Sequence, residues 1–237
     1  MSTPYAERAQ QVRAGLQSVQ RRIAAACADA GRDPDEVTLI VITKTFPADD
    51  LRILAELGVT DIGENRHQEA EAKVAECRDL GLRWHFVGGL QSNKAAAVAA
   101  YSDVVESVDR RKLVRRLNEG AHGRSGPVDC LVQVSLDEPG AQGRSGADPA
   151  DLPALADEIE AAGMLRLRGL MAVAPLGVDP RVPYRRLSEL HAQLVSARPE
   201  ATWLSAGMSS DLEEAIRAGA THVRIGTAIL GSRPQVQ

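Results

Sequence analysis

The feature that most constrains the fold of this chain is a repeated alternation between short apolar runs and segments with helical spacing. Eight runs have the length and apolar content of buried strands, and each is followed by a helix or helical turn. These runs lie at residues 38–44, 59–63, 83–88, 104–108, 128–135, 165–173, 202–205 and 222–226. Eight such units predict an α/β protein with a single (β/α)8 TIM barrel, while an open doubly wound sheet stays as the alternative.

An additional helix is expected before the first strand. Apolar residues at positions 12, 16, 19, 23 and 27 keep helical spacing, Pro4 suits the first helical position, and Gly31 suits the end. Residues 119–127 and 137–149 are rich in glycine and proline and are expected to be loops. The second loop follows the fifth strand, where it is either a mobile lid or a tolerated insertion. No linker is evident, so we expect one domain over residues 1–237.

Composition excludes several classes of function. The net charge of −4 and the aromatic content of 3% argue against a nucleic-acid-binding surface. Cys27, Cys77 and Cys130 are far apart and form no Cys-x-x-Cys motif, which argues against a disulfide framework or a zinc site. No signal peptide or membrane-spanning segment is evident. These features predict a cytoplasmic protein, and the sparse aromatics favour a monomer.

The first candidate functional residue is Lys44, at the end of the most hydrophobic strand. In barrels and open α/β sheets, ligands bind at the carboxyl ends of the strands. Lys44 has two interpretations at this edge. It is either a solvated or ion-paired lysine, or a partly buried amine that forms a Schiff base with an aldehyde or ketone.

The second candidate is an anion site formed by the turns after the last two strands. Residues 205–211 are small and polar and lead into a helix, and residues 224–231 contain a second glycine turn. Each turn alone reads as an ordinary helix cap, but barrels commonly bind phosphate between these two loops. Arg224 lies two residues before Gly226. It is either part of a surface ion pair or a donor to a ring atom or phosphate oxygen.

A closed barrel makes these two candidates neighbours, because strand eight pairs with strand one. A ligand with an aldehyde at one end and a phosphate at the other would span them. Pyridoxal 5′-phosphate (PLP) has this structure.

At this point a specific resemblance can be stated. The chain resembles the pyridoxal phosphate homeostasis protein family, also called proline synthase co-transcribed protein, from its first helix to Gly231. The motifs that carry the resemblance are, in chain order, Ile42-Thr43-Lys44-Thr45, Ile62-Gly63-Glu64-Asn65-Arg66, Trp84-His85-Phe86-Val87-Gly88, Leu90-Gln91-Ser92-Asn93-Lys94, Gly169-Leu170-Met171, Gly207-Met208-Ser209-Ser210-Asp211 and Val223-Arg224-Ile225-Gly226-Thr227.

The resemblance implies a barrel like the N-terminal domain of alanine racemase, with PLP bound to Lys44 as a Schiff base. It assigns phosphate contacts to Ser209, Gly226 and Thr227, with help from the backbone of Met208. It also implies that Arg224 faces the pyridine nitrogen. Asn65 and His85 are placed in the pocket, although a hydrogen-bonded core histidine is the alternative for His85.

Three functions are compatible with these residues. The first is a PLP carrier that sequesters the cofactor and delivers it to PLP-dependent apo-enzymes, without catalytic turnover of its own. It is favoured because the sequence ends after the eighth strand, where alanine racemase continues into a domain that supplies a second acid–base group. The second is a PLP-dependent amino-acid racemase or lyase. The third is a sugar-phosphate aldolase that uses a lysine Schiff base without a cofactor.

Overall fold

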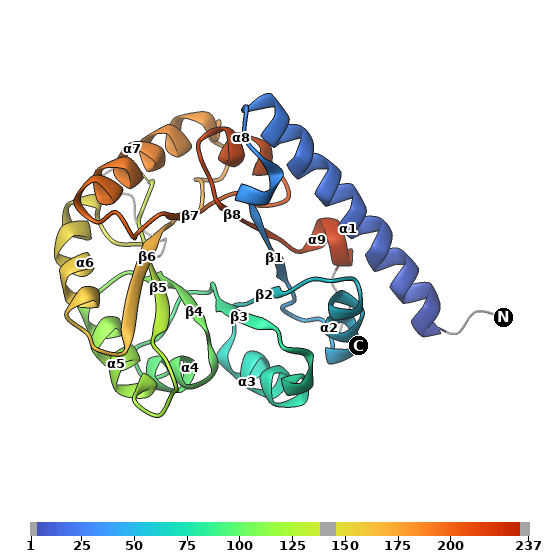
Figure 1. The fold of residues 1–237 in the computed structure, drawn as a ribbon, viewed down its shortest axis with the longest axis horizontal. Coiled ribbons are helices and arrows are strands. Elements are labelled where there is room, and N and C mark those ends of the chain that lie inside the picture. The colour runs from blue at the N-terminus through green and yellow to red at the C-terminus, as the bar shows by residue number, and fades with distance from the viewer. Residues whose placement is uncertain (1–3, 138–145, 233–237) are drawn as a thin grey trace.

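The computed structural model describes residues 4–137 and 146–232, and its centre is a closed barrel of parallel strands. Figure 1 shows these strands as a ring surrounded by helices. The strands follow chain order around the ring, and β1 pairs with β8 to close it. The predicted (β/α)8 barrel is therefore confirmed, and the open-sheet alternative is wrong. The strands are β1 (Thr38–Ile42), β2 (Asp61–Glu64), β3 (Arg83–Phe86), β4 (Val104–Val108), β5 (Val128–Gln133), β6 (Leu165–Met171), β7 (Trp203–Ser205) and β8 (His222–Ile225).

The helices surround the barrel, and the predicted N-terminal helix is present. Three short 3-10 turns, at Pro34–Glu36, Arg78–Leu80 and Pro149–Asp151, interrupt the connections. The prediction that a loop begins at residue 119 is wrong, since the preceding helix continues to Ala121. Most of the expected loop at 137–149 lies outside the described residues. The α-helices are α1 (Pro4–Asp29), α2 (Ala48–Glu56), α3 (His67–Glu76), α4 (Ala95–Tyr101), α5 (Arg111–Ala121), α6 (Leu152–Glu160), α7 (Arg181–Ala197), α8 (Leu212–Arg217) and α9 (Thr227–Leu230).

Helix α1 covers the barrel on the side where β8 meets β1. Its buried face consists of the residues whose spacing predicted the helix, including Val12, Leu16 and Ile23. They share one apolar cluster with outward-facing strand residues such as Val41 and Val223. Burying this stripe stabilises α1 on the barrel, since tertiary packing of an apolar face supplies most of the stability of a helix.

The inside of the barrel contains an unusual number of polar side chains. TIM barrels usually fill this space with layers of branched apolar residues. Here β1 contributes the apolar Ile40 and Ile42, which pack where a side chain on Gly63 would stand. Strands β2, β3, β4, β5, β7 and β8 contribute buried charged or polar residues, namely Asp61, His85, Glu106, Asp129, Ser205, His222 and Arg224. The barrel interior is therefore a site of charge pairing as well as of apolar packing.

Two general features of the described residues bear on function. Within residues 4–137 and 146–232, no helix combines the length and the hydropathy that a membrane crossing needs. The same part of the chain contains no group of three or more His, Cys, Asp or Glu side chains arranged to hold a metal ion.

Candidate functional site

Lys44 lies in the turn after β1, at the carboxyl end of the barrel, and is half-buried. It follows Ile40 and Ile42 at two-residue spacing, and those two side chains face the barrel interior. The next residue, Thr45, has a φ of 69°, the one positive φ of a non-glycine residue in the described chain. A threonine in this conformation is strained, so the surrounding structure must hold the turn.

Two side chains of helix α3 fix the residues immediately before and after Lys44. Glu69 accepts a hydrogen bond from the Thr45 N–H at 3.1 Å, and the buried ammonium of Lys73 donates to the Thr43 carbonyl at 2.7 Å. Glu64 completes this support, since one of its oxygens accepts from Lys73 and from the Thr43 hydroxyl, each at 2.7 Å. Both backbone neighbours of Lys44 are thus fixed by charged side chains.

The other oxygen of Glu64 is buried and has no hydrogen-bond partner. Burial raises the pKa of this carboxyl, although Lys73 and Thr43 oppose the shift. Sequence reasoning assigned no separate role to Lys73, because a lysine on a helix is usually solvated.

The turn after β8 approaches the Lys44 turn closely. A Cβ built on Gly226 would lie 3.1 Å from the carbonyl oxygen of Ile42 and 3.3 Å from its Cβ. Glycine is therefore the residue that lets the two turns lie this near, with Lys44 only two residues past Ile42. Thr227 follows as the first residue of α9 and is exposed.

The turn after β7 is organised by Asp211. Its carboxylate accepts from the Met208 N–H at 2.6 Å and from the buried Tyr184 hydroxyl at 2.8 Å. Gly207 enters this turn with a φ of 92°, and a Cβ there would lie 2.7 Å from the Cβ of Ala215. Since the Met208 N–H is already bonded inside the turn, the half-exposed Ser209 is the better placed of these two residues to bind an anion.

Arg224 lies inside the barrel, 5% exposed, so it is not part of a surface ion pair. Its guanidinium donates to the Ser205 hydroxyl at 2.6 Å and to the Ala172 carbonyl at 2.8 Å. It also lies 3.7 Å from Glu106, and Ser205 donates to that carboxylate at 2.6 Å. The Ser205 hydroxyl, the Ala172 carbonyl and the Glu106 carboxylate thus fix the Arg224 side chain inside the barrel, near the carboxyl end of β8.

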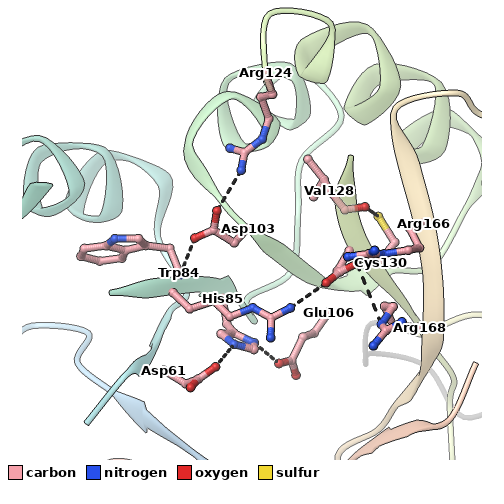
Figure 2. A network of polar contacts seen from close by, with 12 residues as sticks. Asp61, Trp84, His85, Asp103, Glu106, Arg124, Val128, Cys130, Arg166 and Arg168 are labelled. Atoms are coloured by element: carbon pink, nitrogen blue, oxygen red, sulfur yellow. Dashed lines mark hydrogen bonds and ion pairs between the residues drawn. The ribbon is translucent and has the colours of Figure 1, made fainter. Parts of the chain in front are cut away.

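His85 is fully buried between two carboxylates, as Figure 2 shows. Its Nδ1 lies 2.9 Å from Glu106 and its Nε2 lies 2.9 Å from Asp61. Burial opposes a charge on the ring, but the hydrogen bonds and negative charges of both partners raise the pKa of His85. This environment matches the core-histidine interpretation, in which both ring nitrogens are already used.

Glu106 connects His85 to Arg224. Burial by itself would raise its pKa, but the hydrogen bond and charge of His85, together with the charge of Arg224, hold the pKa at about 2. Asp61, His85, Glu106 and Arg224 therefore form a buried series of alternating charge. Sequence reasoning missed Glu106, for which the signal was a Glu-Ser pair inside an apolar strand, Val104–Val108, and it placed Ser205 only in the anion turn.

Asn65 is the first residue after β2, and its side-chain oxygen is buried without a partner. Gly88 packs against it, since a Cβ on Gly88 would lie 2.3 Å from the Asn65 carbonyl oxygen. Asn65 lines a cavity of about 210 Å³ together with Gln91 and Lys94. A buried amide oxygen with no partner is typical of a group that bonds to a ligand or water.

Comparisons with known proteins place the chain among related sequences and structures. The family model described as the alanine racemase N-terminal domain matches residues 16–234. A pyridoxal phosphate homeostasis protein from Pseudomonas aeruginosa is 42% identical over 218 residues, covering 92% of this chain and 94% of that protein. A protein of the same name from Mycobacterium tuberculosis is 39% identical over 248 residues, covering 97% and 95%. PipY of Synechococcus elongatus, solved with PLP bound, superposes with a TM-score of 0.76 at 37% identity, covering 88% of this chain and 100% of PipY.

Proposed function

The chain belongs to the alanine racemase N-terminal domain family, and from this premise we propose that it is a PLP-binding protein of PLP homeostasis. In this role it holds PLP on Lys44 as a Schiff base and releases it to PLP-dependent apo-enzymes. The observation that carries the proposal is the approach of Gly226 to the Ile42 backbone, which brings the glycine turn beside the Lys44 turn.

The described residues fit the functional groups of PLP. The Lys44 amine suits the aldehyde, and Ser209, Gly226 and Thr227 suit the phosphate, since small residues let backbone N–H groups approach an anion. Met208 stays in this set through its backbone, although Asp211 already accepts from its N–H. Asn65 offers an unpartnered buried oxygen, and Arg224 offers a guanidinium for the ring nitrogen.

We assign His85 a positioning role, because its ring nitrogens bond to Asp61 and Glu106. Its connection to the pocket is a series of polar contacts from His85 to Glu106, from Glu106 to Ser205 and from Ser205 to Arg224.

The environment of Arg224 supports binding without turnover. Bound PLP supplies an aldehyde carbon and an electron-withdrawing ring, and a protonated ring nitrogen makes that ring a stronger electron sink. Arginine does not give up a proton in proteins, and the guanidinium of Arg224 lies 3.7 Å from Glu106. A ring nitrogen facing Arg224 would therefore stay unprotonated, which disfavours carbanion chemistry.

The proposal extends to the setting of the protein. Residues 1–237 act as one PLP-binding domain, present as a monomer in the cytoplasm. Its partners are PLP and the apo-enzymes that receive it. Reversible exchange of an amine at Lys44 provides the release step, because a Schiff base yields to another amine or to water.

The visible spectrum of the isolated protein tests this proposal. Wild-type protein loaded with PLP is expected to be yellow and to bleach with borohydride, with the label found on Lys44 by peptide mapping. Lys44→Ala should stay colourless, because it lacks the amine. Lys112→Ala is the matched control, since Lys112 is an exposed residue of α5. Colour that persists in Lys44→Ala, with a label on another lysine, would contradict the assignment.

The family also supports one alternative, a PLP-dependent amino-acid racemase or lyase. Racemisation or cleavage of an amino acid at a rate that disappears in Lys44→Ala would favour that alternative. Its absence across the common amino acids, with the colour intact, would favour the carrier.

A further inference from the structure

Helix α1 lies outside the eight βα units but runs along the two helices that follow the anion turns. Figure 1 shows α1 passing beside α8 and α9 on the outside of the barrel. The apolar face of α1 packs against the barrel wall. Two of its arginines have another role: Arg22 reaches a backbone carbonyl in the turn after β7, and Arg8 reaches the carbonyl at the end of the short helix that follows the turn after β8.

Arg22 connects α1 to the turn after β7. Its Nε and Nη2 bond to the two carboxylate oxygens of Glu213 at 2.7 and 2.9 Å, and Nη2 also donates to the Ser209 carbonyl at 2.9 Å. The described chain has no cis peptide bond, so the Ser209 carbonyl and the Ser210 N–H point in opposite directions. By fixing the carbonyl toward α1, Arg22 turns the next N–H away from α1.

The turn after β8 is fixed by the same helix. Helix α9 is only four residues long, too short to be stable without support. Gly15 of α1 lies directly against it, since a Cβ there would be 2.5 Å from the Ile229 carbonyl oxygen. Arg8 donates to the carbonyl of Leu230, the last residue of α9, at 3.0 Å.

Arg8 also reaches the Lys44 side of the site. It makes two hydrogen bonds to the carboxylate of Asp50, both 2.8 Å, and its guanidinium lies 5.7 Å from the ring centroid of Phe46. Phe46 is buried and follows Lys44 by two residues. One arginine therefore connects the end of α9 to the segment that carries the reactive amine.

We infer that α1 is a clamp that positions both halves of the phosphate site, with Arg22 and Arg8 as its positioning residues. This inference rests on the proposed function, since it assumes that the anion bound at Ser209, Gly226 and Thr227 is a phosphate. The clamp acts on the phosphate end of PLP and leaves the chemistry of Lys44 unchanged. Its loss loosens the two turns relative to each other and weakens binding of any ligand that needs both.

The test compares Arg22→Met with Arg32→Met. Arg32 is a matched control because it too pairs its Nε with a glutamate, Glu36, and donates to backbone carbonyls, those of Ile216 and Ala220. Those carbonyls lie at the far end of α8 from Ser209. Three probes are titrated into each protein: PLP and its phosphate-free analogue pyridoxal by visible absorbance, and inorganic phosphate by calorimetry.

Arg22→Met is expected to weaken PLP and phosphate binding about tenfold, the effect of losing one charge-assisted hydrogen bond, while pyridoxal capture stays within about twofold. Arg32→Met should leave all three unchanged, whatever it does to the melting temperature. Unchanged PLP and phosphate affinity in Arg22→Met would overturn the clamp. So would an equal loss for pyridoxal, since that indicates general destabilisation.

Two further variants keep the inference testable if Arg22→Met folds poorly. Arg22→Lys retains the charge but cannot bridge Glu213 and the Ser209 carbonyl with a planar fork, so it should weaken PLP and phosphate binding and spare pyridoxal. Arg8→Met should also weaken PLP and phosphate binding; because Arg8 contacts Asp50 and Phe46 on the Lys44 side as well, the comparison with pyridoxal is made on the Arg22 variants. Failure of the proposed function looks different: wild-type protein would stay colourless with both PLP and pyridoxal.

Discussion

Glu106 is the residue on which the polar interior of the barrel depends. It accepts from His85 with one oxygen and from Ser205 with the other, and it faces Arg224 at 3.7 Å. Two buried side chains, the His85 imidazole and the Arg224 guanidinium, therefore share this carboxylate. A buried charge is tolerated when it is paired and hydrogen-bonded, and removing one partner leaves the others uncompensated.

The first residue-scale prediction is that Glu106→Gln destabilises the protein strongly. The substitution keeps the size of the side chain but removes the negative charge between His85 and Arg224. We expect the free energy of unfolding to fall by roughly 3–5 kcal/mol, the usual cost of breaking a buried ion pair from one side. Urea unfolding at neutral pH measures it.

Glu119→Gln provides the control for Glu106→Gln. Glu119 is exposed near the end of α5 and, within the described residues, forms an ion pair with Arg116 alone, so its loss should change stability by less than about 1 kcal/mol. An equal effect of the two substitutions would show that the interior charges do not act as a connected series.

At the scale of elements, the turns at the carboxyl ends of neighbouring strands pack backbone against backbone. The turns after β1 and β8 meet at Gly226 and Ile42, and the turns after β2 and β3 meet at Gly88 and Asn65. At Gly88 glycine is required, because a Cβ would lie 2.3 Å from the Asn65 carbonyl oxygen, a main-chain atom that cannot move aside as a flexible side chain can; at Gly226 a Cβ would make a tight contact, 3.1 Å from the Ile42 carbonyl oxygen. The shape of the candidate site is therefore set by contacts between turns.

Gly88→Ala is predicted to be costly for this reason. The added Cβ would lie 2.3 Å from the Asn65 carbonyl oxygen and 2.7 Å from its Cα, so one of the two turns must shift. We expect a loss of about 1–3 kcal/mol in the free energy of unfolding, together with weaker PLP binding through displacement of Asn65. Chemical denaturation and absorbance titration measure the two effects.

Gly123→Ala is the comparison for that substitution. Nothing lies within 4 Å of the Cβ position there, and Gly123 has no positive φ, so alanine should be tolerated or slightly stabilising. A Gly88→Ala protein as stable as Gly123→Ala would mean that the two turns do not pack as tightly as the structure has them.

At the scale of the whole molecule, buried histidines make stability depend on pH. Burial lowers the pKa of His222 to about 4, whereas the carboxylates beside His85 raise the pKa of that histidine. The pKa shifts of the two histidines are therefore opposite in sign. His222 is neutral in the folded protein and takes up a proton on unfolding below its ordinary pKa of about 6.5, while the contribution of His85 is already complete there.

The free energy of unfolding should therefore fall as the pH drops from about 6.5 toward 4, because the unfolded chain binds more protons at residue 222. His222→Gln is expected to reduce this dependence. His191, whose pKa burial also lowers, remains and leaves part of it. Urea unfolding at pH 6.5 and 5.0 gives the slope for both proteins. An identical slope in wild type and His222→Gln would contradict the environment assigned to His222.

The sequence was sufficient to predict the barrel and to predict that the turns after the first and last strands are neighbours, because both follow from local patterns and chain order. Strand β4 has the predicted bounds, and the others differ by a few residues at their ends, where caps and turns decide. Once eight βα units close into a ring, Lys44 after the first strand and Gly226 after the last must lie side by side. Local periodicity and one topological rule were sufficient for that.

The tertiary structure alone decided which side chains meet across the barrel and over its surface. Ser205 bonds to Glu106 across 99 residues of chain, Arg22 reaches Ser209 across 187, and Arg8 reaches Leu230 across 222. Such pairs depend on the stagger between strands and on the path of α1 over the barrel. Neither the stagger nor the path of α1 produces a periodic pattern in the sequence. Hydrophobic spacing specifies which face of an element is buried, but not which distant residue that face will contact.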